Sequence, residues 1–249
     1  MPCFAAWALW CTGRTDQSLA RIEDALSLAR DLSEPTGLAH AALFASVIYQ
    51  FRRDPLMAQY YAEAVIDIAR EHGLVLYGAM ASIMQGWTLS KRGGATQAID
   101  QIREGLAALD ATGTYLVRPH FLALLAEVFC KVDRTDEALL LLDEALAMVN
   151  GKGERYYEAE LHRQKGELLL KQTAGNHAQA EECFRRSLAI AESQQARSWQ
   201  LRTALSLARL YRSQGKLLEA RNLLAPIYES FTEGFETDDL RDAAVLLQT

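Results

Sequence analysis

The chain has 249 residues, of which 50% are hydrophobic, and its formal net charge at pH 7 is −6. This length and apolar content are enough for one large hydrophobic core or two small ones. The acidic balance, without any long run of Lys or Arg, argues against a nucleic-acid surface, which needs clustered positive charge. The four cysteines contain no CxxC pair, so they exclude zinc-finger spacing and indicate reduced thiols in a cytoplasmic protein.

The chain opens with the apolar stretch "MPCFAAWALWCTG", residues 1–13. This stretch lacks the basic start of a signal peptide and is far shorter than the roughly 20 residues of a membrane-spanning helix. It therefore predicts the first helix of a bundle, and we expect no contact with a membrane.

Small residues then recur at a nearly constant interval, each followed three positions later by an aromatic residue or a leucine. The interval is 40 residues, with one step of 42, and the positions are Ala6, Ser46, Gly86, Ala126, Gly166 and Ala208. A second series follows in the same register, at Ser18, Ala58, Ala98, Ala138, Ala180 and Ala220. Two series in one register predict six repeats of about forty residues.

Each repeat has the pattern of two helices joined by a turn. In the fourth repeat, apolar residues recur every three or four positions in "RPHFLALLAEVFCK" and again in "TDEALLLLDEALAMV", with "VDR" between them. Turn-forming residues separate the helices of other pairs, for example in "RRDP", "RGGA" and "SQGK". The last segment, "ETDDLRDAAVLLQ", predicts one more helix with Thr237 or Asp238 as its N-cap, which covers the open end of the stack.

The sequence therefore predicts one all-α domain over residues 1–249, a right-handed superhelix of six helix pairs. The predicted pairs are about 1–34, 35–73, 74–113, 114–153, 154–195 and 196–234, with a capping helix over 236–248. The small residues let paired backbones approach closely, and large apolar neighbours fill the flanking grooves. This is similar to the tetratricopeptide pattern, although its usual period is only about 34 residues; HEAT-type repeats share the longer period and stay the alternative.

Several long stretches carry a more specific resemblance. "ERYYEAELHRQKGELLL", "AEECFRRSLAIAESQQARSWQLRTALSLARLYRSQGK", "EARNLLAPIYESFTEGFETDDL" and "MQGWTLSKRGG" resemble the C-terminal tetratricopeptide-like repeat region of bacterial multidomain signalling proteins. In that family a class III adenylate/guanylate cyclase or DNA-binding regulator is fused to an AAA/STAND-type ATPase, and the repeats follow. Nothing in this chain aligns with the cyclase or the ATPase. The resemblance implies a non-enzymatic sensory or regulatory arm that acts with an ATPase or cyclase domain in cis or in trans.

Chemical motifs are missing from the sequence. It contains no phosphate-binding loop, nucleophile elbow or zinc-protease motif, and its five histidines are scattered, so we expect no catalytic residue, metal or cofactor. Glu158 and His162 lie four residues apart, a spacing that suits a shared metal or proton. However, His162 also lies four residues before the close-packing Gly166, which predicts that it faces the neighbouring helix instead.

In tetratricopeptide stacks, the first helices of the pairs line a concave groove. The repeat register gives this groove an aromatic and apolar N-terminal half and a charged C-terminal half. The candidate groove-binding residues are His120, Glu127, Glu160, Arg163, Glu167, Arg202, Arg209, Arg212 and Trp87. Arginine binds carboxylate or phosphate bidentately, so the groove suits a peptide, a protein or a small anionic ligand. Alternatively, these arginines and glutamates pair only with one another.

The register also assigns the remaining tryptophans. Trp7 and Trp10 are expected to pack against an upstream repeat, and Trp199 between the fifth and sixth pairs. Two alternative functions stay open: an enzyme or small-molecule-binding protein with an anionic-ligand site in the groove, and a dimerisation module. The enzyme requires Glu127, Glu167 and His120 to converge in a closed pocket.

Overall fold

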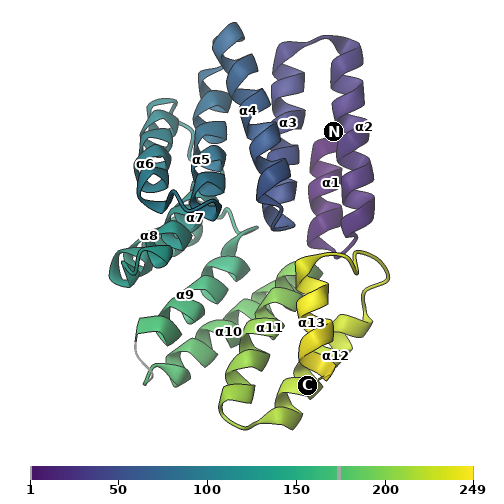
Figure 1. Cartoon of the computed structure of the whole chain (residues 1–249), viewed down its shortest axis with the longest axis vertical. Coiled ribbons are helices and arrows are strands. Elements are labelled where there is room, and N and C mark those ends of the chain that lie inside the picture. Colours follow the sequence, from purple (N-terminus) through teal and green to yellow (C-terminus); the bar gives the residue numbers. More distant parts are fainter. Residues whose placement is uncertain (1, 173–174, 249) are drawn as a thin grey trace. The chain divides into compact units, whose positions relative to one another are not determined.

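The structure, a computed structural model, describes residues 2–172 and 175–248. These residues form thirteen α-helices and no β-strand, which confirms the predicted all-α repeat fold (Figure 1). The helices are α1 (Pro2–Cys11), α2 (Thr15–Leu32), α3 (Pro35–Phe51), α4 (Pro55–His72), α5 (Val75–Lys91), α6 (Ala95–Ala111), α7 (Arg118–Lys131), α8 (Thr135–Lys152), α9 (Glu158–Gln172), α10 (His177–Ser193), α11 (Arg197–Ser213), α12 (Leu217–Glu229) and α13 (Asp238–Gln248).

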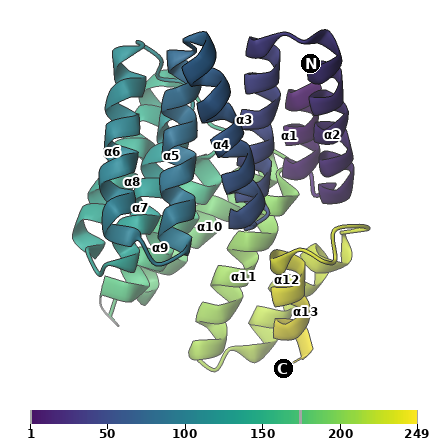
Figure 2. The ribbon, with the colours of Figure 1, turned by 45° about the horizontal axis from the view of Figure 1, so that its top comes forward.

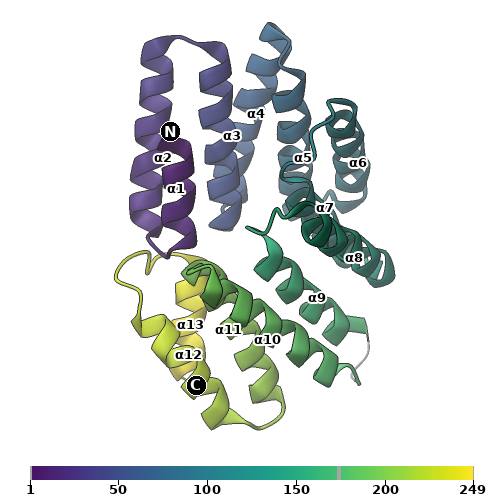
Figure 3. The ribbon, with the colours of Figure 1, turned by 180° about the vertical axis from the view of Figure 1, so that it is seen from behind.

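Two compact units make up the chain: the first comprises Met1–Ala8 and Gln17–Arg134, the second Leu9–Asp16 and Thr135–Thr249. In the first unit, α3 pairs with α4 and α5 with α6, and α7 packs against both α5 and α6 (Figure 2). In the second, α8 packs on α9, α9 pairs with α10 and α11 with α12 (Figure 3). Helix α13 packs on both α11 and α12. The single domain over residues 1–249 stays a prediction.

Local sequence signals set the helix ends. Helix α4 begins at Pro55, and the carboxylate of Asp54 accepts a hydrogen bond from the amide of Met57 at 3.0 Å. The same helix ends at Gly73, whose φ of 67° is the left-handed conformation that glycine adopts at no cost. Helix α13 begins at Asp238, so Thr237 occupies its N-cap position.

The small residues of the two series contact one another where paired helices cross. Ser46 Oγ donates a hydrogen bond to the carbonyl of Ala58 at 2.8 Å, which joins α3 to α4. A Cβ added to Gly166 would lie 2.6 Å from Cε1 of Phe184, far inside ordinary contact distance. The close-packing role predicted from the repeat register therefore holds at these crossings.

Candidate functional site

An ion-paired cluster occupies the second unit, on α9 and α11. Arg163 donates to both carboxylate oxygens of Glu160, from Nε at 2.7 Å and from Nη2 at 2.6 Å. Its Nη1 contacts Glu167 Oε1 at 2.5 Å and donates to Ser206 Oγ on α11 at 3.2 Å. Arg163 and Glu160 are only 7% and 3% exposed. This is the bidentate geometry that gives arginine–carboxylate pairs their specificity.

The charges of this cluster hold each other ionised. Burial alone would raise the pKa of Glu160, but the Arg163 guanidinium and its hydrogen bonds outweigh burial and keep that pKa below its usual value. Burial likewise acts to lower the pKa of Arg163, and the carboxylates of Glu160 and Glu167 raise it instead. The buried pair is therefore a salt bridge at neutral pH.

The arginines of α11 reach toward α13. Arg202 Nε donates to Asp239 Oδ2 at 2.6 Å, and Arg209 Nη2 donates to Asp242 Oδ2 at 2.8 Å. Arg202 is 4% exposed, whereas the Arg209 side chain is 47% exposed. We call Glu160, Arg163, Glu167, Arg202 and Arg209, with their two partners on α13, the charged face.

Arg212, also on α11, bonds the backbone of α13. Its Nη1 donates to the carbonyl of Leu246 at 2.8 Å, near the C-terminal end of α13, where carbonyl groups lack intrahelical donors. A basic side chain at this end also suits the helix dipole.

A tryptophan contact stabilises the buried side of the charged face. The guanidinium carbon of Arg202 lies 5.2 Å from the ring centre of Trp10 and 5.2 Å from that of Trp199. The two tryptophan rings meet edge to face at 4.6 Å, and Trp199 also meets Tyr157 at 5.2 Å. The expectation that Trp10 packs against an upstream repeat is therefore wrong, because residues 9–16 belong to the second unit and Trp199 covers the ring.

The first unit has a separate polar group on α5 and α7. Trp87 Nε1 donates to Glu127 Oε2 at 2.9 Å, and Lys91 forms an ion pair with the same carboxylate. Burial acts to raise the pKa of Glu127, but the positive charge of Lys91 brings it below its usual value. The Lys91 ammonium also lies 4.8 Å from the ring centre of Trp87.

His120 has a different environment in the same unit. It is 1% exposed, and its Nε2 lies 3.1 Å from Gln50 Oε1 on α3. His120, Glu127 and Glu167 thus each contact a different set of partners. The enzyme alternative requires these three side chains to converge, and their contacts give it no support.

Glu158 and His162, four residues apart in the sequence, lie in two different environments. Glu158, 3% exposed, accepts a hydrogen bond from Arg155 Nη1 at 3.0 Å. His162, 7% exposed, lines a cavity of about 530 Å³ together with Lys165 and Cys183. Burial, followed by the charges of Arg186 and Lys165, lowers the pKa of His162 to about 4. The imidazole is therefore neutral at pH 7.

The sequence did not identify Asp239 and Asp242 as partners of the charged face. The sequence pattern predicts only a capping helix for their segment, although two acids three positions apart share one side of a helix. Within residues 2–172 and 175–248, no three His, Cys, Asp or Glu side chains are grouped to hold a metal ion. In the same residues, no helix is long and apolar enough to cross a membrane.

Comparison with known proteins agrees with the repeat assignment. The family model described as tetratricopeptide repeat matches residues 120–193 and 157–233. An uncharacterised protein of Rhizobium meliloti (strain 1021) is 25% identical over 206 residues. That match covers 82% of this chain but only 20% of the relative, so the chain spans about a fifth of that protein's length.

Several solved structures share the fold at low sequence identity. A Rap protein complexed with competence and sporulation factor matches with a TM-score of 0.67 at 14% identity, over 99% of this chain and 72% of that one. BtubC (BKLC) from P. vanneervenii matches with a TM-score of 0.60 at 15% identity, over 88% of this chain and 94% of that one. These matches show a shared helical-repeat fold, and the tetratricopeptide repeat model matches only within residues 120–233; HEAT-type repeats stay the alternative for the rest of the chain.

Proposed function

We propose that this chain is a non-enzymatic repeat scaffold that binds a protein or peptide, as the sensory or regulatory arm of a bacterial signalling ATPase linked to a cyclase or a transcription regulator. The tetratricopeptide-like repeats support the binding role. So does the Rap protein, which has a similar fold and was solved in complex with competence and sporulation factor. The Rhizobium meliloti relative supports the regulatory role, because its matched part is 20% of a much longer protein.

The charged face is the surface that we assign to the partner. Its buried members, Arg163 and Glu160, already bond each other, so they are not available to a partner. Its exposed members are the Arg209–Asp242 pair, with side chains 47% and 41% exposed, and Glu167, 43% exposed. An exposed ion pair contributes only about 0–1 kcal/mol, so a carboxylate of a partner can replace Asp242 on Arg209 at little cost.

Replacement of Asp242 by a partner's carboxylate would also change how α13 is held on α11. Arg202, Arg209 and Arg212 each bond α13, so a partner that takes Arg209 removes one of these three links. The mechanism is then a shift of α13 against α11 when the partner binds. In the first unit, Glu127 stays a candidate for a further contact of the partner, because its side chain is 31% exposed. Trp87 and His120, 2% and 1% exposed, are buried, so their prediction as groove-binding residues is wrong.

A selection experiment tests the binding surface. A random peptide library displayed on phage is selected against the whole chain, and an enriched peptide is labelled for fluorescence anisotropy. Arg209→Ala should weaken its binding about tenfold, the loss expected for one charged contact. The matched control is Arg185→Ala, which removes an exposed arginine paired with Glu181 on α10. Equal effects of the two substitutions would contradict the assignment of the charged face.

The regulatory role has its own test. The part of the Rhizobium meliloti protein outside the matched 206 residues is expressed separately and tested for ATP hydrolysis; where it hydrolyses ATP, the rate is measured with and without this chain. We expect the chain to change the rate while hydrolysing no ATP by itself. An unchanged rate would refute the regulatory role and leave the binding role standing.

A further inference from the structure

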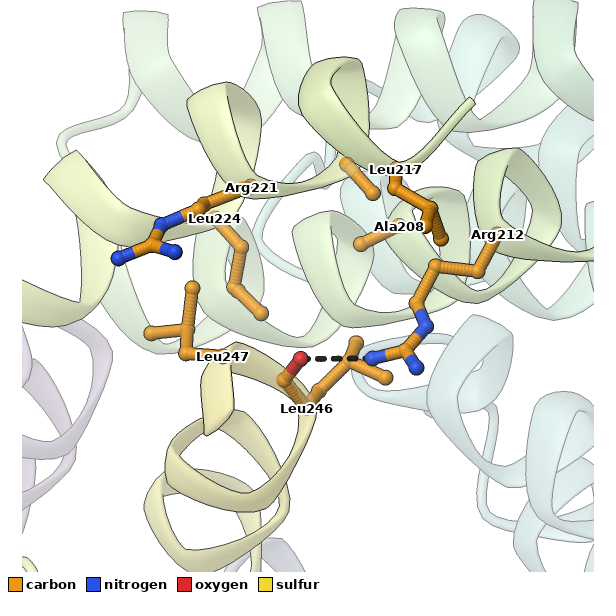
Figure 4. A pocket seen from close by; sticks show the side chains of 8 residues that line it. Ala208, Arg212, Leu217, Arg221, Leu224, Leu246 and Leu247 are labelled. Atoms are coloured by element: carbon orange, nitrogen blue, oxygen red, sulfur yellow. Dashed lines mark hydrogen bonds between the residues drawn. The ribbon is translucent and has the colours of Figure 1, made fainter. Parts of the chain in front are cut away.

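An apolar hollow lies in the second unit, where α11, α12 and α13 meet (Figure 4). It is a cavity of about 120 Å³ that is open to solvent. Its apolar lining is formed by Leu217, Leu224, Leu246, Leu247 and two alanines. We call it the end groove.

The size of the end groove limits what it can hold. An apolar cavity of roughly 150 Å³ accepts a benzene-sized guest, so this slightly smaller volume suits one aliphatic side chain. Leu217 lines the groove and is nevertheless 58% exposed. An inserted side chain would remove this leucine from water, which is the favourable direction for apolar surface.

The charges at the end groove have a single sign. Arg212 and Arg221 complete its lining, which contains no acidic residue. Figure 4 shows them at opposite ends of the apolar side chains, Arg212 on α11 and Arg221 on α12. Among the residues that the structure describes, Arg221 forms no ion pair or hydrogen bond through its side chain, so its guanidinium is available.

We propose that the end groove is a docking site for a partner peptide segment that carries one aliphatic anchor flanked by acidic residues. The anchor fills the cavity between α11, α12 and α13, and the acids contact Arg221, while Arg212, which bonds the carbonyl of Leu246, adds positive charge at the other end of the groove. An aliphatic anchor supplies apolar burial, while the two arginines set the position of the flanking acids. This site is separate from the charged face, and its failure would leave that assignment untouched.

The probe is a short synthetic peptide with one central leucine flanked by aspartates, labelled for fluorescence anisotropy against the whole chain. Arg221→Glu should weaken its binding at least about tenfold, because one attraction becomes a repulsion. Arg186→Glu on α10 is the matched control, since it makes the same charge change at another exposed helical position, whose side chain forms no ion pair or hydrogen bond within the described residues. Circular dichroism checks that both variants keep the wild-type helix content.

Two altered peptides separate the two features of the site. Replacing the leucine by serine should abolish binding through loss of the anchor, and replacing the aspartates by asparagines should weaken it in a salt-dependent way. The proposal is overturned if the serine peptide binds as tightly as the leucine peptide, or if the two charge-reversal variants behave alike. It is also overturned if the peptide fails to bind and light scattering shows a dimer that Arg221→Glu abolishes, because a second copy then fills the groove.

Discussion

Replacing Gly166 by alanine tests whether close packing of paired helices governs this fold. Gly166 lies inside α9, where a Cβ would be 2.6 Å from Cε1 and 2.9 Å from Cδ1 of Phe184 on α10. Phe184 is fully buried, at 0% exposure, so its ring has no solvent-filled space into which to turn. Alanine must therefore push α9 and α10 apart or force the ring from its preferred rotamer.

Two opposing effects decide the magnitude. Overpacking a filled core costs about 1–3 kcal/mol, whereas glycine to alanine in a helix interior gains about 1 kcal/mol. We expect Gly166→Ala to destabilise the α9–α10 pair by about 1 kcal/mol. Gly78→Ala in α5 is the control, because its Cβ would meet only Ala69 Cβ at an ordinary 3.4 Å. That variant should be stabilised by about 1 kcal/mol.

The assay must be local, because a repeat chain with two units need not unfold in one step. Hydrogen exchange read by mass spectrometry reports the opening of each helix pair separately. Peptides from α9 and α10 should exchange roughly five- to tenfold faster in Gly166→Ala. Phe184→Leu makes room for the methyl group, so the double variant should be less destabilised than the sum of the two single variants, by at least about 0.5 kcal/mol. If Gly166→Ala slows exchange as Gly78→Ala does, the close-packing argument is refuted.

Two further predictions concern the charged side chains. Arg163→Ala should lower the free energy of unfolding by about 3–5 kcal/mol, because it leaves the buried Glu160 carboxylate without its partner, while Arg209→Ala should lower it by about 0–1 kcal/mol. Urea denaturation of the two variants measures both losses. Similar losses in the two variants would contradict the contrast in burial. The pKa of His162 is lowered from 6.5 to about 4, so the unfolded chain takes up the proton first and the stability linked to neutral His162 is lost as pH falls from about 6.5 toward 4. His162→Gln should remove that part of the pH dependence. If the difference in unfolding free energy between the wild type and this variant is the same at every pH in this window, protonation of His162 is not linked to stability.

Features that depend on neighbouring repeats could be predicted from the sequence. A helix crossing needs a small side chain at a fixed place in every repeat, so periodicity alone located Gly166 and Ser46. The span of α7, Arg118–Lys131, likewise follows from its local apolar pattern and the turn after it. These features are set by residues within about one repeat of each other.

Contacts between distant segments could not be predicted in this way. Ser198 Oγ donates to the carbonyl of Trp10 at 2.6 Å across 188 residues of chain, and no repeat register specifies that partner. The partners of the α11 arginines could not be predicted either. Their charge suggested ligand binding, but each guanidinium can satisfy its donors with any acid or carbonyl that the fold brings near. The order of the residues does not reveal which of these partners α13 supplies.

The arginines that the repeat register places together in one groove differ in how deeply they are buried. Arg163 and Arg202, 7% and 4% exposed, pair with carboxylates where water cannot replace either partner, so their removal acts on the fold. Arg209 has the same chemistry but is 47% exposed, and its pair can be exchanged at little cost. Arg221, which the groove register did not select, has no competing acid in its surroundings at the end groove. A partner should therefore depend most on the arginines whose loss the fold tolerates best, and binding and stability should respond to different members of the same residue type.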